Sequence, residues 1–215
     1  MKKLKNIRKE NNYTQREVAE YSGVGFSCIR SFEQNDEKIK NAWICNLIKL
    51  CKFYNIMVED LFDIDSLKKE IETKKEQYEK ENPQKEKSYK TAYYDLISQW
   101  KTRKLISELQ AKQLNEKIKK IENSNERENR KNVRALIYPY SPIAQNEIDD
   151  TAGRFRRKRY IEDISINEIA SILGKHPMLI ASYLDRQKNF NTMNALTAVK
   201  MCLILNGTVE ELFQI

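Results

Sequence analysis

The stretch from Thr14 to Glu33 constrains the fold of this chain more than any other part of the sequence. Thr14 is placed to cap the first turn of a short helix, and Val18 and Ala19 fall on one face of that helix. Gly23 follows Ala19 by four residues, where a helix must end and the chain must turn through a left-handed conformation. The stretch therefore begins with a short helix and a glycine turn.

A second short helix follows this turn directly. Val24 packs the turn, Gly25 opens the helix, and the spacing of Ile29 and Phe32 turns both side chains inward. Ala19 is small because the second helix crosses over it. Two short helices locked at a steep angle around a glycine turn are the plan of a helix-turn-helix motif.

The chain from Lys3 to Phe62 resembles the lambda-repressor/Cro-like (XRE-type) helix-turn-helix domain over almost its full length. The residues that carry the resemblance are Leu4, Ile7 and Arg8, the Thr14-Gln15 start, the Gly23-Val24 turn, the Ile29-x-x-Phe32-Glu33 end and the closing Val58-x-Asp60-Leu61-Phe62. In that family an arginine of the first helix pairs with a glutamate that ends the recognition helix, and the resemblance assigns these places to Arg8 and Glu33. The expected structural positions are Arg8, Ala19, Gly23, Ile29 and Glu33. The resemblance covers under a third of the chain and implies a DNA-binding transcriptional regulator.

Base contacts are expected on the outward face of the second helix. If this helix enters the major groove, the positions that face base edges are Phe26, Ser27, Arg30 and Ser31. Arg30 can bind a guanine with two hydrogen bonds or contact a phosphate, and the two serines can donate or accept. Phe26 departs from the polar residue that is usual in the family, and it either contacts a thymine methyl group or folds back on the surface.

Phosphate contacts are expected on both sides of that helix. In the family, the side chain at the position of Gln15 and the helix N-terminus meet a phosphate. Lys38 and Lys40 lie in a predicted polar loop, residues 34–40, at the usual second phosphate contact. A solvated charge is the plain alternative for each lysine.

The composition agrees with a nucleic-acid partner. The 215 residues carry a net charge of +8 and few glycines or prolines, which favours a helical chain with an acidic partner, although a solvated lysine-rich surface gives the same charge. The cysteines form no CxxC pair and are interpreted as small buried side chains in a reducing cytoplasm, not as disulfides or a zinc site. They are Cys28, Cys45, Cys51 and Cys202.

Other classes of protein find little support. The first twelve residues lack the apolar core of a signal peptide, and no apolar run approaches the length of a membrane span, so a cytoplasmic protein is expected. The only histidine, His176, sits in a predicted turn without a catalytic constellation, and the sequence has no glycine-rich phosphate loop. No enzymatic activity, cofactor or metal is therefore expected.

Helical periodicity continues through most of the remaining chain, which predicts an all-α fold. The predicted elements are a first helix from residue 4 to about 11, a helix from 44 to about 54, a closing turn at 58–62, an amphipathic helix from 64 that Pro83 stops, and a helical hairpin at 88–100 and 107–121. The amphipathic helix is either a solvated spacer or a short coiled coil. In the hairpin, Tyr93, Leu96 and Trp100 pack either within it or against another element or a second subunit. Residues 123–132 are interpreted as a flexible link and residues 133–150, with Pro139 and Pro142, as an extended linker.

The end of the chain repeats its beginning. A shift of roughly 151 positions aligns the N-terminal motif with the C-terminus without a gap. The matched positions include Glu17-Val18-Ala19 with Glu168-Ile169-Ala170, Gly23 with Gly174, Ile29 with Ile180, Phe32 with Tyr183, Cys51 with Cys202, Asn55 with Asn206 and Val58 to Phe62 with Val209 to Phe213. Four parts are therefore predicted: a helix-turn-helix domain at 1–63, a helical spacer and hairpin at 64–132, an extended linker at 133–150 and a diverged lambda-repressor-like domain at 151–215.

The repeat diverges where DNA would be read. Glu33 is matched by Leu184, so that Arg159 lacks the partner that Arg8 has. The second recognition helix offers few hydrogen-bond donors to base edges, but a basic cluster, Arg154 with Arg156 to Arg159, can still meet phosphates. The possible second DNA surface comprises Arg156, Arg157, Lys175, Met178 and Ser182. A role in dimerisation or packing is favoured for this domain.

The sequence therefore favours a sequence-specific regulator that binds double-stranded DNA, a repressor or autoregulator of a phage or mobile element. Because one such domain makes few base contacts, two recognition helices must act together. They come either from a homodimer, which is favoured, or from both domains of one chain. The alternative is a protein-interaction factor, an antitoxin or an inhibitor of a host factor, whose middle or C-terminal region binds a protein partner while the helix-turn-helix serves autoregulation.

Overall fold

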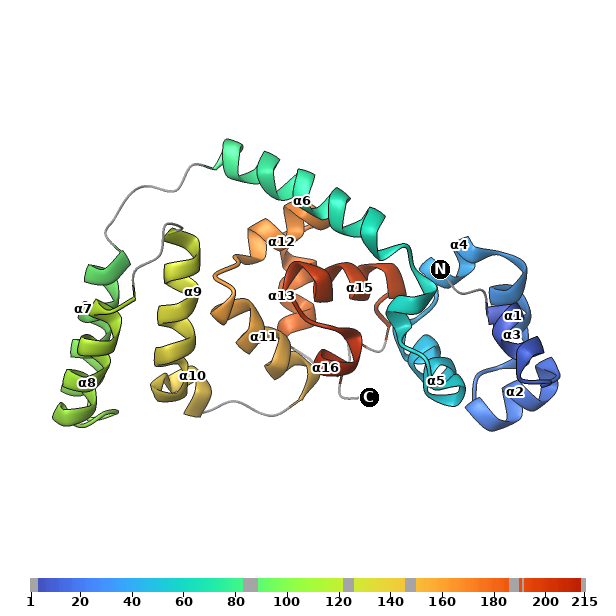
Figure 1. The fold of residues 1–215 in the computed structure, drawn as a ribbon, viewed down its shortest axis with the longest axis horizontal. Helices are drawn as coiled ribbons and strands as arrows, with labels where there is room; N and C mark the ends of the chain where they lie inside the picture. The colour runs from blue at the N-terminus through green and yellow to red at the C-terminus, as the bar shows by residue number, and fades with distance from the viewer. Residues whose placement is uncertain are drawn as a thin grey trace.

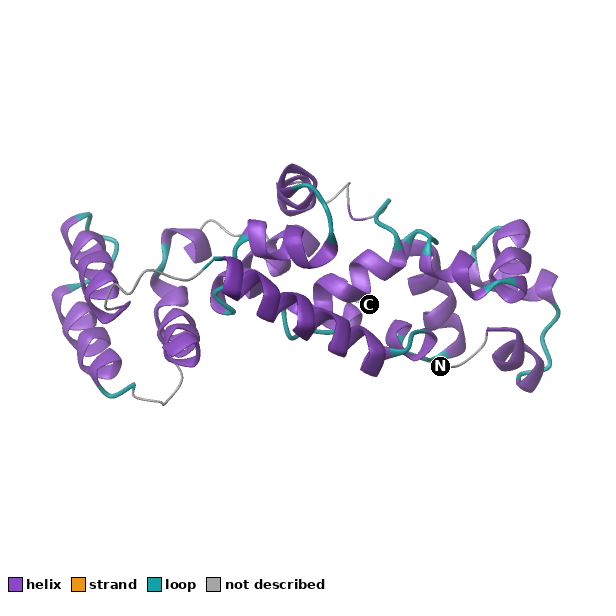
Figure 2. Ribbon diagram, turned by 90° about the horizontal axis from the view of Figure 1, so that it is seen from above, coloured by secondary structure: helices purple, strands orange, loops and turns teal. Residues whose placement is uncertain are grey.

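The computed structural model describes residues 4–82, 89–121, 126–145, 150–185, 190 and 192–213. Within these residues the chain folds into helices joined by short turns and contains no strand (Figures 1 and 2). The predicted all-α class is confirmed for this part of the chain. Figure 1 shows an elongated arrangement, with the N-terminal helices at one end, the C-terminal helices in the middle and residues 89–119 at the other end.

The N-terminal domain consists of α1 (Leu4–Glu10), α2 (Gln15–Ser22), α3 (Phe26–Gln34), α4 (Asp36–Lys40), α5 (Ile44–Tyr54) and the 3-10 helix η1 (Val58–Leu61). A capping box starts α2: the Thr14 hydroxyl accepts from the Glu17 N–H, and the Glu17 carboxylate accepts from the Thr14 N–H at 2.7 Å. Gly23 ends α2 with a φ of 67°, which is the left-handed turn expected there. The helix-turn-helix stretch thus folds as its local signals predict.

The prediction of a polar loop from Gln34 to Lys40 is wrong, because residues 36–40 form α4. The Asn35 side chain caps this helix by accepting from the Glu37 N–H at 2.8 Å. Ile39 is buried and anchors the helix to the core. A five-residue helix with one buried side chain has no periodicity to detect, so the sequence does not indicate it.

The C-terminal unit consists of α11 (Thr151–Ile161), α12 (Ile166–Leu173), α13 (Pro177–Asp185), α15 (Ala195–Ile204) and α16 (Val209–Phe213). Four of these helices begin 151 positions after an N-terminal element: α12 after α2, α13 after α3, α15 after α5 and α16 after η1. Gly174 ends α12 with a φ of 60°, and positive φ angles recur at Asn55 and Asn206. The order of the elements follows the shift in the sequence, and the assignment of this unit to a diverged helix-turn-helix-like domain stays a prediction.

α6 (Ile64–Glu81) leaves the N-terminal domain and lies across α12 and α15 (Figure 1). Ile71 of α6 is buried, and the Glu70 carboxylate pairs with the Lys200 ammonium at 2.6 Å. The amphipathic helix expected here is present, and its apolar stripe packs against the core of the same chain. Pro83, which was expected to stop it, lies outside the described residues.

α7 (Tyr89–Thr102) and α8 (Glu108–Lys119) form the expected hairpin, and the S-x-x-Q capping box at the start of α8 is present. The hairpin shares a small core, separate from that of the two ends of the chain, with a third helix, α9 (Glu126–Ile137). Trp100 and Val133 are buried in it, and the Tyr93 hydroxyl accepts from Arg134 Nε at 2.8 Å. Tyr93, Leu96 and Trp100 therefore pack in a core that the hairpin shares with α9, and contact with a second subunit stays a prediction.

The prediction of a flexible link followed by an extended linker is wrong for residues 126–145, which form α9, η2 (Tyr138–Tyr140) and α10 (Pro142–Gln145). The first two turns of α9 carry no apolar residue, and ion pairs to the C-terminal unit hold them instead. Pro139 and Pro142 stand in the first turns of short helices, where proline is tolerated. Residues 122–125 and 146–149 of the predicted link and linker lie outside the described residues.

Candidate nucleic-acid interface

α3 has one face in the core and one face in solvent. Ile29 and Phe32 are buried in the N-terminal domain, at 3% and 7% exposure. On the opposite face, Phe26 is 43% exposed, and Ser27 and Arg30 are exposed. The same helix is therefore fixed on one side and accessible on the other.

The exposed face of α3 brings together three of the four residues expected to read bases. Among the residues that the structure describes, Arg30 has neither an ion-pair nor a hydrogen-bond partner for its side chain. Ser27 lies one turn before it, and Phe26 begins the helix. Ser31 is half-buried and is the least accessible of the four.

A bidentate ion pair fixes the end of α3 to α1. The Arg8 guanidinium donates from Nε to Glu33 Oε1 at 2.6 Å and from Nη2 to Glu33 Oε2 at 2.9 Å, as the resemblance implies. Gln15 Nε2 donates to the same Glu33 Oε2 at 2.8 Å. Burial raises the pKa of Glu33, but the hydrogen bonds from Arg8 and Gln15 outweigh it and hold this pKa below its ordinary value. Glu33 is therefore a charged anchor at neutral pH.

A shallow hollow of about 550 Å³ lies beside the N-terminal end of α3. Its lining comes from α1, α2, the turn between them and the start of α3: Arg8, Lys9, Asn12, Tyr13, Thr14, Gln15, Arg16 and Phe26. Lys9 and Arg16 are exposed, and neither side chain has a partner within the described residues. The hollow can therefore receive a phosphate group of a DNA strand that runs past α3.

Sequence reasoning missed these two cations. It predicts Gln15 for the phosphate contact, but the Gln15 amide is bonded to Glu33. Lys9 follows Arg8 and Arg16 follows Gln15 in the chain, so each adjoins a position that the resemblance singles out. Their position next to Arg8 and Gln15 was the signal available in the sequence. Only the packing of α1, α2 and α3 in the structure shows that both cations line one hollow.

Lys38 and Lys40, the other predicted phosphate contacts, lie on α4 beyond the end of α3. Lys38 is exposed. The Lys40 ammonium contacts the Glu37 carboxylate at 2.5 Å in a pair that is largely exposed. Exposed pairs of this kind contribute little, so Lys40 can exchange Glu37 for a phosphate at small cost.

The predicted second DNA surface, on the C-terminal unit, does not form a continuous basic patch. Arg156 donates to the Leu184 carbonyl, and the Ser182 hydroxyl donates to the Leu179 carbonyl at 2.8 Å. The other three members, Arg157, Lys175 and Met178, are exposed. Only two of the five residues therefore present a cation to solvent.

Most of the basic cluster on α11 serves the fold of the C-terminal unit. Arg154 is buried and donates from Nε to the Leu212 carbonyl at 3.0 Å. Arg159, which corresponds to Arg8, donates to the Ile164 carbonyl at 3.1 Å, and its buried Nε has no hydrogen-bond partner among the residues that the structure describes. Burial lowers the pKa of Arg159. These arginines hold backbone carbonyls where phosphates were expected.

α9 covers the corner of the C-terminal unit that corresponds to the hollow beside α3. Ion pairs hold it there: Arg127 with Glu168 at 2.7 Å, Arg130 with Asp163 at 2.5 Å, Arg134 with Asp163 at 2.6 Å and Lys131 with Glu162 at 2.9 Å. The Arg134 guanidinium also lies over the Tyr160 ring, 4.9 Å from its centroid. Where the N-terminal domain has an open basic hollow, the C-terminal unit thus has an acidic corner with a helix on it.

Residues 4–61 match a protein-family model described as helix-turn-helix. The N-terminal domain is therefore a helix-turn-helix domain, which supports a DNA-binding regulator, and the resemblance in the sequence is confirmed over these residues. Neither the comparison with curated proteins nor the comparison with solved structures gives a match. In the described part of the chain, every helix is too short or too polar to cross a membrane.

Proposed function

We propose that the chain is a sequence-specific regulator that binds double-stranded DNA by inserting α3 into the major groove. The observation that carries the proposal is the contrast between the two faces of α3: Ile29 and Phe32 are buried, while Arg30 is exposed and has no partner within the described residues. A side chain that can form two hydrogen bonds with a guanine, presented by a fixed helix, suits direct readout. Within this class we favour a repressor or autoregulator, of a phage or another mobile element, that acts by occupying its operator.

The cations around α3 suit the backbone on either side of the groove. Lys9 and Arg16 line the hollow before the helix, and Lys38 and Lys40 follow it. Phosphate contacts at both ends orient the helix, and the base contacts between them carry the specificity. This division assigns sequence preference to Phe26, Ser27 and Arg30 and general affinity to the lysines and Arg16.

A selection of bound duplexes from random DNA, run on the wild type and on Arg30→Ala, tests the proposal. The wild type is expected to enrich one motif. The variant is expected to lose about 1–3 kcal/mol of binding free energy and its preference at one position of that motif. If the wild type shows no preference among duplexes at moderate salt, the proposal is wrong.

The exposed apolar residues of α13 favour a second candidate function, that of an antitoxin or inhibitor that binds a protein. Met178 is 75% exposed and Leu179 is 40% exposed. Large exposed apolar patches mark protein-binding sites, and these two adjacent side chains are candidates for the centre of one. A pull-down with the full chain and with Met178→Glu tests this function. It is supported if one stoichiometric protein is retained by the wild type alone and both forms bind DNA equally, and it fails if both forms retain the same proteins.

A further inference from the structure

The N-terminal domain and the C-terminal unit meet along a seam in which corresponding residues exchange hydrogen bonds. The Ile44 N–H donates to the Met193 carbonyl at 2.9 Å, and the Ala195 N–H donates to the Ala42 carbonyl at 2.8 Å. Ala195 follows Ile44 by 151 positions, and Met193 follows Ala42 by the same interval. Between them, Trp43 and Asn194, which also correspond, form an antiparallel bridge.

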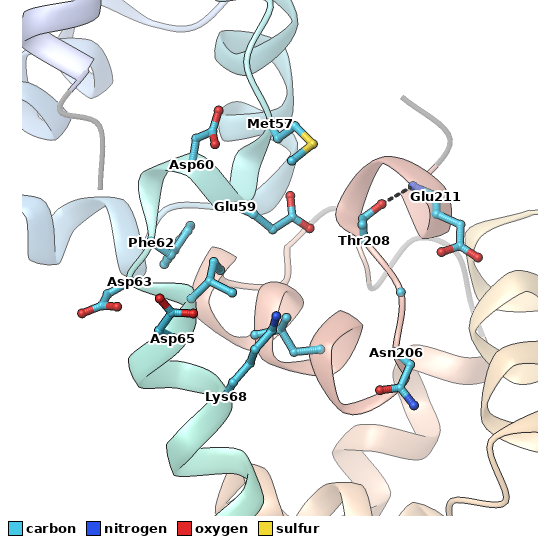
Figure 3. A pocket seen from close by; sticks show the side chains of 13 residues that line it. Met57, Glu59, Asp60, Phe62, Asp63, Asp65, Lys68, Asn206, Thr208 and Glu211 are labelled. Carbon is cyan, nitrogen blue, oxygen red and sulfur yellow. Dashed lines mark hydrogen bonds between the residues drawn. The ribbon is translucent and has the colours of Figure 1, made fainter. Parts of the chain in front are cut away.

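A second exchange of the same kind lies between η1 and α16. The Val58 N–H donates to Glu210 Oε1 at 3.2 Å, and the Val209 N–H donates to Glu59 Oε1 at 2.7 Å. Figure 3 shows Glu59 pointing from η1 toward the segment that carries Thr208, just before Val209. In each exchange, a residue of one part bonds to a residue of the other part, and the counterparts of these two residues form the same bond in the opposite direction. This reciprocity defines a two-fold, isologous interface.

Corresponding residues also line two cavities along the seam, and one hydrophobic core extends across it. One hollow of about 730 Å³ includes Asn206 and Glu211 in its lining (Figure 3). A second hollow of about 410 Å³ includes the corresponding Asn55 and Asp60. Buried residues from both sides belong to one continuous hydrophobic cluster, which runs from Leu4 to Leu212. The two parts therefore pack as one body around a local two-fold axis.

The C-terminal unit lacks the groups that the N-terminal domain places in its basic hollow and on its reading helix. The positions that correspond to Lys9, Arg16 and Arg30 are Tyr160, Asn167 and Ala181. The corner that corresponds to the basic hollow is acidic and lies under α9. The basic hollow of the N-terminal domain is thus open, and its counterpart is covered, while the exposed face of α13 is apolar where α3 carries Arg30.

From these observations we propose that the chain is a single-chain pseudo-dimer with one reading helix, in place of the homodimer with two recognition helices that the sequence favours. The C-terminal unit is a diverged copy of the DNA-binding domain, it occupies in cis the face through which a second such domain would pair, and one chain binds one asymmetric DNA site. The partner implied is a duplex with a single half-site, without an inverted copy one helical turn away. This inference rests on the proposed function for its DNA part, and the pairing itself can be tested without DNA.

The first experiment measures the mass of the full chain alone and on the duplex enriched by selection. A monomer is expected at micromolar concentration, and one chain per duplex is expected in the complex. A scan of base substitutions is expected to reduce binding along one continuous run of base pairs and to have no effect about 10 bp away, where an inverted half-site would lie. Two chains per duplex on inverted half-sites would overturn the inference.

The second experiment locks the seam. Trp43 and Asn194 face each other across an antiparallel bridge. The Cα atoms of two residues paired in this way are close enough for a disulfide. The Trp43→Cys/Asn194→Cys double variant is expected to oxidise within one chain, to keep a monomeric mass and to bind the selected duplex within twofold of its reduced form. Trp43→Cys and Asn194→Cys alone are the controls for reactions of the native cysteines.

The outcomes of the second experiment separate the two proposals. Disulfide-linked dimers, a failure to oxidise, or DNA binding that is lost on oxidation would each show that the seam is not the working arrangement. If the wild type binds every duplex equally, the DNA-binding proposal fails, while an intramolecular disulfide still supports the pairing.

Discussion

The N-terminal domain and the C-terminal unit share an order of helices but expose different chemistry. Buried positions of the helix-turn-helix are kept in type, as Ile29 and Ile180 show, and both glycines after the second helix have a positive φ. Exposed positions differ: a basic hollow on one part corresponds to an acidic corner under α9 on the other. The comparison teaches that two parts of a chain can keep the same kinds of buried residue at corresponding positions while their surfaces carry opposite charge.

The Arg8–Glu33 pair is present in the N-terminal domain only, and breaking it is expected to have the largest effect. Glu33→Ala leaves the Arg8 guanidinium poorly compensated and is expected to cost about 3 kcal/mol of unfolding free energy at neutral pH. Because the pKa of Glu33 is lowered in the fold, its contribution is present above the ordinary glutamate pKa of 4.5 and is lost as the pH falls through the lowered value. Urea titrations of both forms at several pH values check this. The exposed Gln34→Ala is the control, and a difference that persists unchanged at pH 2 would contradict the explanation.

Exchanging the residues at positions 12 and 163 tests the difference between the basic hollow and the acidic corner. Asp163→Asn removes the charge that holds Arg130 and Arg134 and is expected to cost about 2 kcal/mol of unfolding free energy without a change in DNA affinity. Asparagine tolerates the positive φ of this position, as Asn12 does at its counterpart. The reverse change, Asn12→Asp, brings a negative charge into the basic hollow and is expected to weaken DNA binding with little effect on stability. Equal effects of the two changes on DNA affinity would show that the two corners are equivalent.

The basic hollow can be tested through the salt dependence of binding. Lys9→Ala and Arg16→Ala are each expected to weaken binding by a similar factor for every duplex sequence and to reduce the slope of log affinity against log salt by about 1. Asn167→Ala, at the counterpart of Arg16, is the matched control and is expected to leave the slope unchanged. A loss of preference at a single base, with the slope intact, would place these side chains on bases instead.

The smallest effect is expected at the seam itself. Burial is the main cause that raises the pKa of Glu59, and the neighbouring Glu210 carboxyl adds to it. Within the described part of the chain, one buried oxygen of each carboxyl has no hydrogen-bond partner. A raised pKa means that the stabilisation by Glu59 is full below pH 4.5 and is lost as the pH rises through the raised value. Glu59→Gln is therefore expected to stabilise the chain by about 1 kcal/mol at pH 7 and by less at pH 4. Thermal unfolding at both pH values checks this, with Glu20→Gln, at an exposed position of α2 away from the seam, as the control, and a destabilisation at pH 7 would contradict it.

The sequence predicts the helix-turn-helix because its signals are local. Thr14 and Glu17 satisfy each other's backbone across one turn, and Gly23 adopts the conformation that its place requires. The residues expected to read bases also follow from helical spacing, since Ile29 and Phe32 fix which side of α3 faces out. Of these, only Ser31 is less accessible than expected.

The parts that the sequence does not predict depend on contacts between distant segments. α9 has no apolar residue in its first two turns, and the acids that hold it lie about thirty to forty positions further along the chain. The seam uses backbone hydrogen bonds of Ala42 and Ile44, which leave no mark on residue type. The hollow beside α3 could not be predicted because Lys9 and Arg16 belong to two different helices, and only the structure shows that they lie close together.

The bridge between Trp43 and Asn194 joins two stretches of one polypeptide. In an assembly of identical subunits every substitution is made twice, and an improvement on one side of the axis is forced on the other. Here each side is encoded separately. One side can therefore be selected for what it recognises and the other for how firmly it supports its neighbour, without compromise between the two.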